Sequence, residues 1–196
     1  ANGSIYEGEF SLGKKHGQGK LTMLRGLVYE GLHQEGKEHG QGKLTFPDGT
    51  VYEGEFLYGQ RTGKAQITYA GGYTFVGDCV RGKKEGQGTQ KSANGTVYTG
   101  EFKQNEQSGR GRLTLPSGAV YEGQFVNGSR QGVGHYVKGA LTYTGEWVKD
   151  KRCGAGAMVS SKGNVYVGQF ANDLFHGHGK MSYSKGGLYE GMWNYG

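Results

Sequence analysis

Apolar and polar residues alternate along this 196-residue chain in short stretches that recur at a fixed interval. Each stretch begins with an aromatic residue, has a glycine two residues later and, in most copies, a second aromatic residue two positions beyond. The lead aromatic residues are Tyr6, Tyr29, Tyr52, Phe75, Tyr98, Tyr121, Tyr143, Tyr166 and Tyr189. They are 23 residues apart, except for 22 between Tyr121 and Tyr143. An interval of about 20 to 50 residues is typical of a solenoid or another array of repeats.

Each repeat, numbered from its lead aromatic residue as position zero, predicts two strands joined by a tight turn. Position seven is Gly, Asn or Asp in every copy, and these residue types tolerate the positive φ of a hairpin turn. Longer connections such as Pro47-Asp48-Gly49 and Pro116-Ser117-Gly118 predict the turns that lead to the next hairpin. We therefore expect an all-β fold, an elongated single-layer antiparallel sheet of tandem 23-residue β-hairpin repeats.

The two faces of this sheet are expected to differ, because side chains alternate across a strand. Positions zero, two, four, eleven, thirteen, fifteen and seventeen fall on one face, where glycines leave room for neighbouring rings to lie over bare backbone. Position thirteen is glycine in seven copies and Ala65 in another. The opposite face has glutamates at positions one and three, and often Lys or Arg at position fourteen. Pairs such as Glu7 and Glu9 could form acid/base dyads, but a solvated strand face is the preferred interpretation.

Composition narrows the class of protein further. The 41 glycines accompany 14 tyrosines and 8 phenylalanines but only 2 prolines, which excludes collagen and a disordered glycine-rich linker. No apolar run reaches the roughly 18 residues of a membrane span, so a soluble chain is expected. Cys79 and Cys153 fit a reducing compartment and lie about three repeats apart, too far for a disulfide. The opening Ala1 suggests a fragment of a longer protein.

The pattern Tyr-Glu-Gly-Glu-Phe followed by Gly-x-Gly-x-Leu closely resembles the MORN repeat, from residue 6 to residue 196. Departures are Phe75 for Tyr, His33 and Cys79 at the second aromatic position, Ala65 for Gly, and the short sixth repeat. Within an array over residues 1–196, the predicted repeats are 6–28, 29–51, 52–74, 75–97, 98–120, 121–142, 143–165, 166–188 and a partial 189–196.

The resemblance implies attachment of proteins to membranes, often through phosphoinositides, or the building of cytoskeletal assemblies. The long uninterrupted array looks most like the protist cytoskeletal scaffolds. We therefore expect a non-enzymatic protein without a cofactor, located in the cytoplasm at the cytoskeleton and the membrane periphery, with cytoskeletal or other protein partners.

Basic residues gather at positions eight and nine, which follow the tight turns. The formal net charge is +6. The basic residues, candidates for binding anionic phospholipid, are Lys14, Lys15, Lys37, Arg61, Lys83, Lys84, Arg130, Lys151 and Arg152. A membrane surface attracts such a row, yet charged turns that keep a sheet edge wet explain it equally. Nucleic acid is not expected as a partner, because the aromatic residues are committed to the core.

Apolar residues collect on the charged face in the sixth to eighth repeats. Contiguous apolar surface marks protein interfaces, and an isologous contact is the commonest oligomer, so the sequence predicts a homodimer. The alternative is a solvated sheet that tolerates small apolar residues. Beside Val126, the interface candidates are Val133, Val137, Val148, Ala155, Ala157, Val159, Val167, Ala171, Leu174 and Phe175. The leading prediction is a scaffold that self-associates through its C-terminal repeats, and the alternative is a phosphoinositide-binding module.

Two further patterns in the sequence bear on ligand binding. Gly17-Gln18-Gly19-Lys20 lacks the full phosphate-loop pattern and no helix is predicted to follow, so nucleotide binding is not expected. Cys153 and His176 share position ten in adjacent repeats, near His178, so a zinc completed by a second chain stays open. No metal ligand is assigned.

Overall fold

The computed structural model describes residues 3–196, which form two compact units. Unit 1 contains the residues up to Ala93 together with Phe102–Asn105, and unit 2 contains Asn94–Glu101 and Glu106–Gly196. The first two residues of the predicted array lie outside the described residues. Within residues 3–196 there is no helix of the length and apolarity that a membrane crossing requires.

Among residues 3–196, seventeen strands belong to one antiparallel sheet, and a 3₁₀ turn, Leu24–Gly26, connects the first two hairpins. The strands of unit 1 are β1 (Ile5–Ser11), β2 (Lys14–Thr22), β3 (Val28–Gln34), β4 (Lys37–Thr45), β5 (Val51–Leu57), β6 (Gln60–Thr68), β7 (Thr74–Val80) and β8 (Lys83–Lys91). Residues of β9 (Val97–Lys103) belong to both units. Those of unit 2 are β10 (Glu106–Thr114), β11 (Val120–Val126), β12 (Ser129–Lys138), β13 (Leu141–Val148), β14 (Lys151–Val159), β15 (Val165–Ala171), β16 (Leu174–Ser182) and β17 (Leu188–Asn194).

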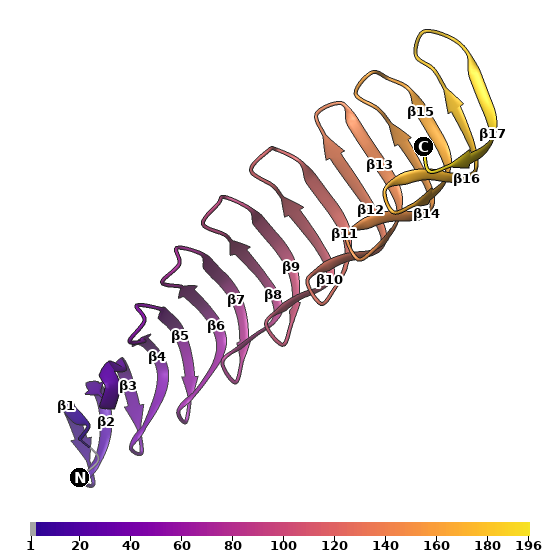
Figure 1. The fold of residues 1–196 in the computed structure, drawn as a ribbon. Coiled ribbons are helices and arrows are strands. Elements are labelled where there is room, and N and C mark those ends of the chain that lie inside the picture. Colours follow the sequence, from indigo (N-terminus) through magenta and orange to yellow (C-terminus); the bar gives the residue numbers. More distant parts are fainter. Residues whose placement is uncertain (1–2) are drawn as a thin grey trace. The chain divides into compact units, whose positions relative to one another are not determined.

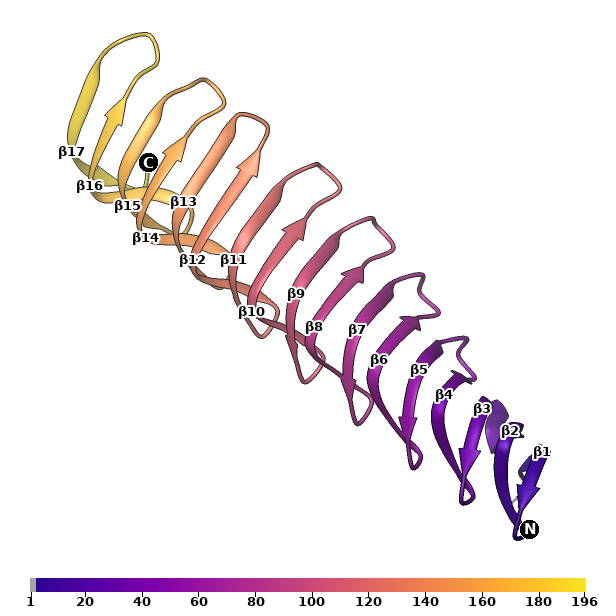
Figure 2. The same cartoon turned by 180° about the vertical axis from the view of Figure 1, so that it is seen from behind.

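Neighbouring strands follow one another in chain order inside each unit, for example β1 with β2 and β10 with β11. The tight turns of a unit lie along one edge of its strands and the longer loops along the opposite edge (Figure 1 and, from behind, Figure 2). Both central turn residues have positive φ, as in Leu12 (47°) and Gly13 (71°), which matches the two-residue hairpin turn. The predicted all-β antiparallel sheet of hairpins is confirmed.

A β-bulge interrupts the hairpins at position eleven, a feature that the alternation pattern alone did not predict. In the first hairpin Gly8 pairs with Gly19, whereas Phe10 pairs with Lys15, so the register shifts between them. Gly17 stands in this bulge with φ of 57°. The glycine at position eleven therefore serves the left-handed backbone of the bulge, not only the room for a ring.

The buried core is a ladder of rings on one face, here called the ring face, which bears positions zero and four. The opposite face, which bears positions one and three, is called the outer face. In unit 2 the Tyr121 ring meets Phe125 at 5.2 Å and Trp147 at 5.1 Å between centroids, edge to face. Each such pair contributes about 0.5–1.5 kcal/mol beyond area burial. A Cβ on Gly134 would overlap the Tyr121 ring, so the predicted role of the position-thirteen glycine holds.

One difference between the ladders of the two units lies at the second ring position of the fourth repeat. In unit 2 each second ring, as with Trp147 between Tyr121 and Tyr143, touches the lead rings on both sides. In unit 1 the corresponding position of the fourth repeat is Cys79, a fully buried thiol. Burial, the largest influence, raises the pKa of this thiol. The row of rings is interrupted there.

Candidate binding surfaces

The tyrosine hydroxyls of the ladder reach the main chain at the bulge. Tyr98 Oη donates to the Glu101 carbonyl at 2.9 Å and approaches the Ser108 carbonyl at 3.2 Å. Burial raises the pKa of Tyr98 to about 12, so its proton stays in place at neutral pH. These hydroxyls supply the donor that the disturbed strand pairing leaves missing. Phe75 has no such hydroxyl.

The glutamates at position three also have a structural task. Glu9 Oε1 accepts a hydrogen bond from the Gln18 amide at 2.9 Å, and Glu101 Oε1 accepts one from the Arg110 amide at 2.9 Å. These amides lie beside the bulge. The sequence interpretation of a solvated strand face is therefore incomplete, because this carboxylate satisfies a main-chain donor.

The predicted row of basic residues divides between two places. The lysines at position eight, Lys14, Lys37, Lys83 and Lys151, are exposed beside the tight turns. The basic residues at position nine pair with the second ring position of the preceding strand, as Arg130 does with Phe125, and turn onto the ring face. These are Lys15, Arg61, Lys84, Arg130 and Arg152, each placed over at least one ladder ring.

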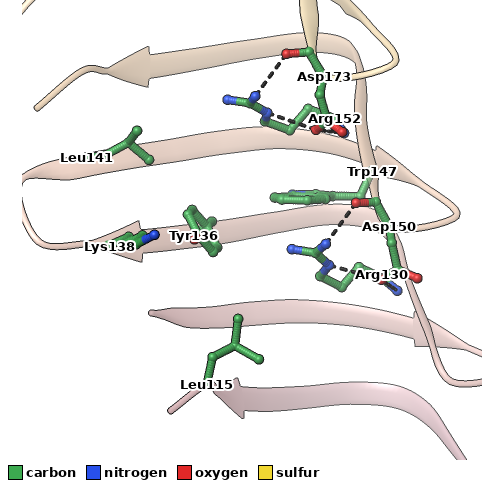
Figure 3. Close-up of a pocket in the computed structure, with 9 residues that line it drawn as sticks. All are labelled: Leu115, Arg130, Tyr136, Lys138, Leu141, Trp147, Asp150, Arg152 and Asp173. Atoms are coloured by element: carbon green, nitrogen blue, oxygen red, sulfur yellow. Dashed lines mark hydrogen bonds and ion pairs between the residues drawn. The ribbon is translucent and has the colours of Figure 1, made fainter. Parts of the chain in front are cut away.

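In unit 2 the two ring-face arginines are held by aspartates of the next tight turn (Figure 3). Asp150 Oδ1 lies 3.0 Å from the Arg130 Nε and 3.0 Å from its amide, while the Asp150 carbonyl accepts from the guanidinium at 2.8 Å. Asp173 holds Arg152 in the same way, with its Oδ1 3.1 Å from Nε. Burial acts to raise the Asp150 pKa, but the hydrogen bonds and charge of Arg130 outweigh it and lower the pKa.

Both ion pairs lie against a hollow of about 360 Å³ on the ring face of unit 2, whose lining includes Tyr136, Leu141 and Trp147. The Arg130 guanidinium stands 4.3 Å from the centroid of the Trp147 ring. Because each cation already has a carboxylate, this hollow presents no uncompensated charge from the pair.

A comparable hollow of about 440 Å³ lies on the ring face of unit 1, beside Arg61 and Lys84. Here the turn positions that hold Asp150 and Asp173 in unit 2 are Gly82 and Asn105. Asn105 Oδ1 accepts from the Lys84 amide at 2.8 Å, as the aspartates do from their arginines, but it has no charge. The two hollows thus share a plan and differ in electrostatics.

The interface candidates lie mostly on the outer face of unit 2. Ala157 pairs with Val167, and Val159 pairs with Val165. Val133 and Val167 are 62% and 55% exposed, and Ala155, Ala157, Val148 and Leu174 are exposed as well. Val137, Val159 and Ala171 are half-buried. Phe175 lies elsewhere than the sequence predicted: it is on the ring face, stacked on Tyr166 with centroids 4.0 Å apart.

The zinc hypothesis receives no geometric support in the described part of the chain. Among residues 3–196 no three His, Cys, Asp or Glu side chains lie close enough to hold a metal ion, Cys153, His176 and His178 included. Cys153 pairs with Glu146 and His176 with Gln169 across their strands.

Sequence reasoning missed the aspartates and Asn105 as ligands of the ring-face basic residues. All three stand at position seven of the repeat, and the positive φ of the tight turn was a sufficient reason for their presence there. Their φ values are 69° for Asp150, 72° for Asp173 and 79° for Asn105. A signal was nevertheless present: Asp occurs at position seven after those repeats that have Arg at position nine in unit 2.

The hairpins, their ring ladder and the two hollows define a tandem-repeat protein of the scaffold or binding-module class. The family model for the MORN repeat matches residues 6–23, 29–51, 52–72, 75–97, 98–120, 121–139, 143–165 and 166–188. The chain therefore belongs to the MORN-repeat family, and that prediction is confirmed, while the protist cytoskeletal subtype stays a prediction. No curated protein sequence matches the chain.

Among solved structures the chain is similar to the TCP10 domain of Danio rerio CPAP. The structure of that domain in complex with a peptide of Danio rerio STIL gives a TM-score of 0.58 at 14% identity, covering 96% of this chain and 83% of that chain. A second structure of the wild-type domain gives a TM-score of 0.52 at 14% identity, covering 88% and 82%. This likeness shows the fold alone.

Proposed function

We propose that the chain is a non-enzymatic scaffold that forms a homodimer through the outer face of its C-terminal repeats, within a membrane-associated cytoskeletal assembly of the cytoplasm. The observation that carries the proposal is the exposed apolar surface of unit 2. Its centre is formed by the cross-strand neighbours Ala157 and Val167 beside Val159 and Val165. Large exposed apolar patches on soluble domains mark interaction sites.

At the register of Ala157 and Val167, the first hairpins of unit 1 have ion pairs instead. Lys20 lies 3.0 Å from Glu30, and Lys43 lies 3.2 Å from Glu53, all about half exposed. The contrast favours a specific use for the apolar face of unit 2. A second copy of the chain fits this face, because a two-fold contact sets one patch against itself. The similar TCP10 domain, solved with a STIL peptide, supports the broader idea that such sheets serve protein partners.

Sedimentation equilibrium of the chain and of a Val159→Glu, Val167→Glu form tests the proposal. The control is Thr68→Glu, Val76→Glu, which places the same charges at the same repeat positions in unit 1, where Val76 is 53% exposed. We expect the mass of a dimer for the original chain and the control, and of a monomer for the unit 2 form. A monomeric original chain, or a dimer that survives both valine replacements, would remove the proposal.

Binding of anionic phospholipid is the second candidate function, supported by the exposed lysines at position eight. Each Lys near an anionic leaflet contributes about 1 kcal/mol. Only Lys14, Lys37, Lys83 and Lys151 of the nine predicted residues stand free of the ring face, which reduces the charge available to a membrane.

Flotation with phosphatidylinositol-phosphate vesicles tests the lipid candidate. Reversal of Lys14, Lys37 and Lys83 to Glu should abolish flotation, while reversal of Arg25, Lys162 and Lys185 at the other edge makes the same charge change and should not. Equal flotation of both forms would exclude this row of lysines as the lipid site.

A further inference from the structure

The hollow on the ring face of unit 1 has two cations, Lys84 and Arg61, with which no carboxylate of residues 3–196 forms an ion pair. These are the features of an anion-binding site. Lys84 is only 7% exposed, and its Nζ has Gln90 Oε1 as a neutral partner at 2.5 Å. The Phe75 and Phe102 ring centroids lie 5.5 and 5.3 Å away. Within residues 3–196 no carboxylate lies within 4 Å of this ammonium. A buried charge without a counter-charge is costly, so an incoming anion has a large favourable interaction to gain.

Arg61 is the second cation of the hollow. Its guanidinium stands 5.3 Å from the Phe46 centroid and 5.5 Å from that of Tyr52. No ion pair of Arg61 occurs among the described residues. The turn beside it has Gly82, where a Cβ would lie 2.5 Å from the guanidinium, so Arg61 occupies the space that a turn side chain would need. The planar fork of Arg61 is thus available for a carboxylate.

Unit 2 shows which chemical group this arrangement accepts. There each ring-face arginine receives an aspartate carboxylate and, in addition, the carbonyl of the same residue, at 2.8 Å for Arg130 and 2.9 Å for Arg152. A carboxylate and a neighbouring carbonyl are what a peptide containing Asp or Glu presents. The Asp–Arg contacts of unit 2 therefore show how an acidic residue of a peptide can bind a ring-face arginine.

The remaining walls favour a peptide over a small anion. Tyr69 and Tyr73 stack with centroids 3.8 Å apart, and with Phe46 they form an aromatic wall in the same hollow. Asp48 is the one carboxylate of the lining, and its Oδ1 is engaged by the Thr50 amide at 2.8 Å. Cations beside aromatic surface match an acidic side chain with an apolar neighbour, and an inositol phosphate has no apolar part for that wall.

We propose that this hollow binds an acidic segment of a partner protein, with one carboxylate between Arg61 and Lys84 and an adjacent apolar side chain against Tyr69 and Tyr73. The site lies in unit 1 and on the ring face, whereas the proposed dimer contact lies in unit 2 and on the outer face. Either proposal can therefore fail without the other.

The test is a titration of the full chain with a capped Pro-Glu-Tyr-Glu-Pro peptide and, separately, with the same peptide in which both Glu are Gln. Backbone amide NMR shifts monitor the binding. We expect the acidic peptide to shift the amides of Arg61, Gly82 and Lys84, and to bind at least about tenfold more tightly than the Gln peptide, since a charge-assisted hydrogen bond is lost in the latter. No binding, or equal binding of the two peptides, overturns the proposal.

Two sets of variants locate the site. Arg61→Gln with Lys84→Gln removes both cations and should abolish binding. Gly82→Asp with Asn105→Asp instead supplies the carboxylates that unit 2 already has. The Arg61 guanidinium has to shift to make room for the new Cβ at position 82, and the carboxylates should then block the site by pairing with the cations. The backbone suits aspartate there, because φ is 76° at Gly82 and 79° at Asn105, against 69° and 72° at Asp150 and Asp173.

Lys83→Gln is the matched control, since it removes one positive charge from the exposed neighbour of Lys84 and should leave peptide binding unchanged. Loss of binding in this control as well would reduce the effect to net charge and overturn the proposal. Titrations with inorganic phosphate and with phosphatidylinositol-phosphate vesicles complete the test. If these bind in a manner that depends on Arg61 and Lys84 while the acidic peptide does not, the hollow is a phosphate site and the proposal is wrong.

Discussion

Unit 1 and unit 2 share one hairpin plan, but they treat the basic residue at position nine differently. In unit 2 Arg130 and Arg152 are neutralised by Asp150 and Asp173, 3.0 and 3.1 Å away. In unit 1 the equivalent turn positions beside Arg61 and Lys84 have no acid. A repeat array can therefore keep its backbone constant and open or close a binding site by changing a single turn residue.

The outer faces differ in the opposite sense. Unit 1 pairs its charges across strands, as in Lys20 with Glu30, whereas unit 2 sets Ala157 against Val167 at the equivalent register. The outer face of unit 2 keeps such ion pairs in other hairpins, Arg112 with Glu122 and Lys180 with Glu190, so the contrast is confined to the hairpins around Ala157 and Val167. The hollow of unit 1 is cationic and the exposed surface around Val167 is apolar, which is why we assign them different partners.

The largest expected difference concerns the ladder. Trp147→Ala in unit 2 removes a ring that touches Tyr121 and Tyr143 and should cost about 3–5 kcal/mol of local stability. Cys79→Ala at the same repeat position of unit 1 removes only a thiol and should cost less than half as much. Hydrogen exchange of the strands beside each site measures both. Equal losses would mean that the ladder is not the main source of local stability.

A smaller difference follows from the hydroxyl that Phe75 lacks. Tyr98→Phe removes the donor to the Glu101 and Ser108 carbonyls and should lower stability by about 1–3 kcal/mol, since buried acceptors are left unpaired. Phe75→Tyr adds the hydroxyl in unit 1 and should raise stability by about 0.5–1.5 kcal/mol. Urea unfolding measures both changes. A Phe75→Tyr form no more stable than the original chain would contradict this account of the bulge.

The period of the aromatic and glycine positions was sufficient to predict the hairpins, their antiparallel sheet and the buried face. The bulge was not predictable, because a glycine at position eleven is equally consistent with room for a ring. Basic residues at positions eight and nine are adjacent in one strand, so strand alternation puts them on different faces, as with Lys83 and Lys84, which pair with Val80 and Cys79.

The ring-face sites depend on contacts between residues about 20 positions apart, such as Arg130 with Asp150, which the pattern within one repeat does not reveal and only a comparison of successive repeats suggests. The outer face of unit 2 was more accessible to sequence reasoning, because strand alternation alone places Val133 and Val167. Phe175 was misplaced because positions eight and nine were treated as one edge, although adjacent residues of a strand lie on opposite faces.

A pH-dependent difference distinguishes His33 in unit 1 from Phe125 at the same repeat position in unit 2. The His33 ring is 3% exposed and lies between Tyr6 and Tyr29, at 4.9 and 5.0 Å between centroids. Burial first, and then the charge of Lys15, lowers its pKa below the ordinary value of about 6.5, against the opposing influence of Glu38 and the Gly31 carbonyl.

The unfolded chain therefore binds this proton more readily than the folded one. The stabilising contribution of neutral His33 is present above about pH 6.5 and is lost as the pH falls from there through the lowered folded pKa. Urea midpoints at pH 7.5 and pH 5 should drop more for the original chain than for His33→Phe, which shares every other titrating group. Identical drops would show that His33 does not couple folding to pH.

The smallest expected effect tests the outer faces. Glu53→Gln breaks the ion pair with Lys43, but both side chains are about half exposed, so stability should change by only about 0.5 kcal/mol and by less at high salt.

The reciprocal change, Ala157→Lys with Val167→Glu, rebuilds that ion pair in unit 2 at the same register. It should leave the folding stability of the chain nearly unchanged while it abolishes the proposed dimer. Sedimentation and urea unfolding of the same sample separate the two results, because a dimer lost together with folding stability would show only that the sheet had been damaged. A dimer lost at constant stability places the difference between the units in their surfaces and not in their hairpins.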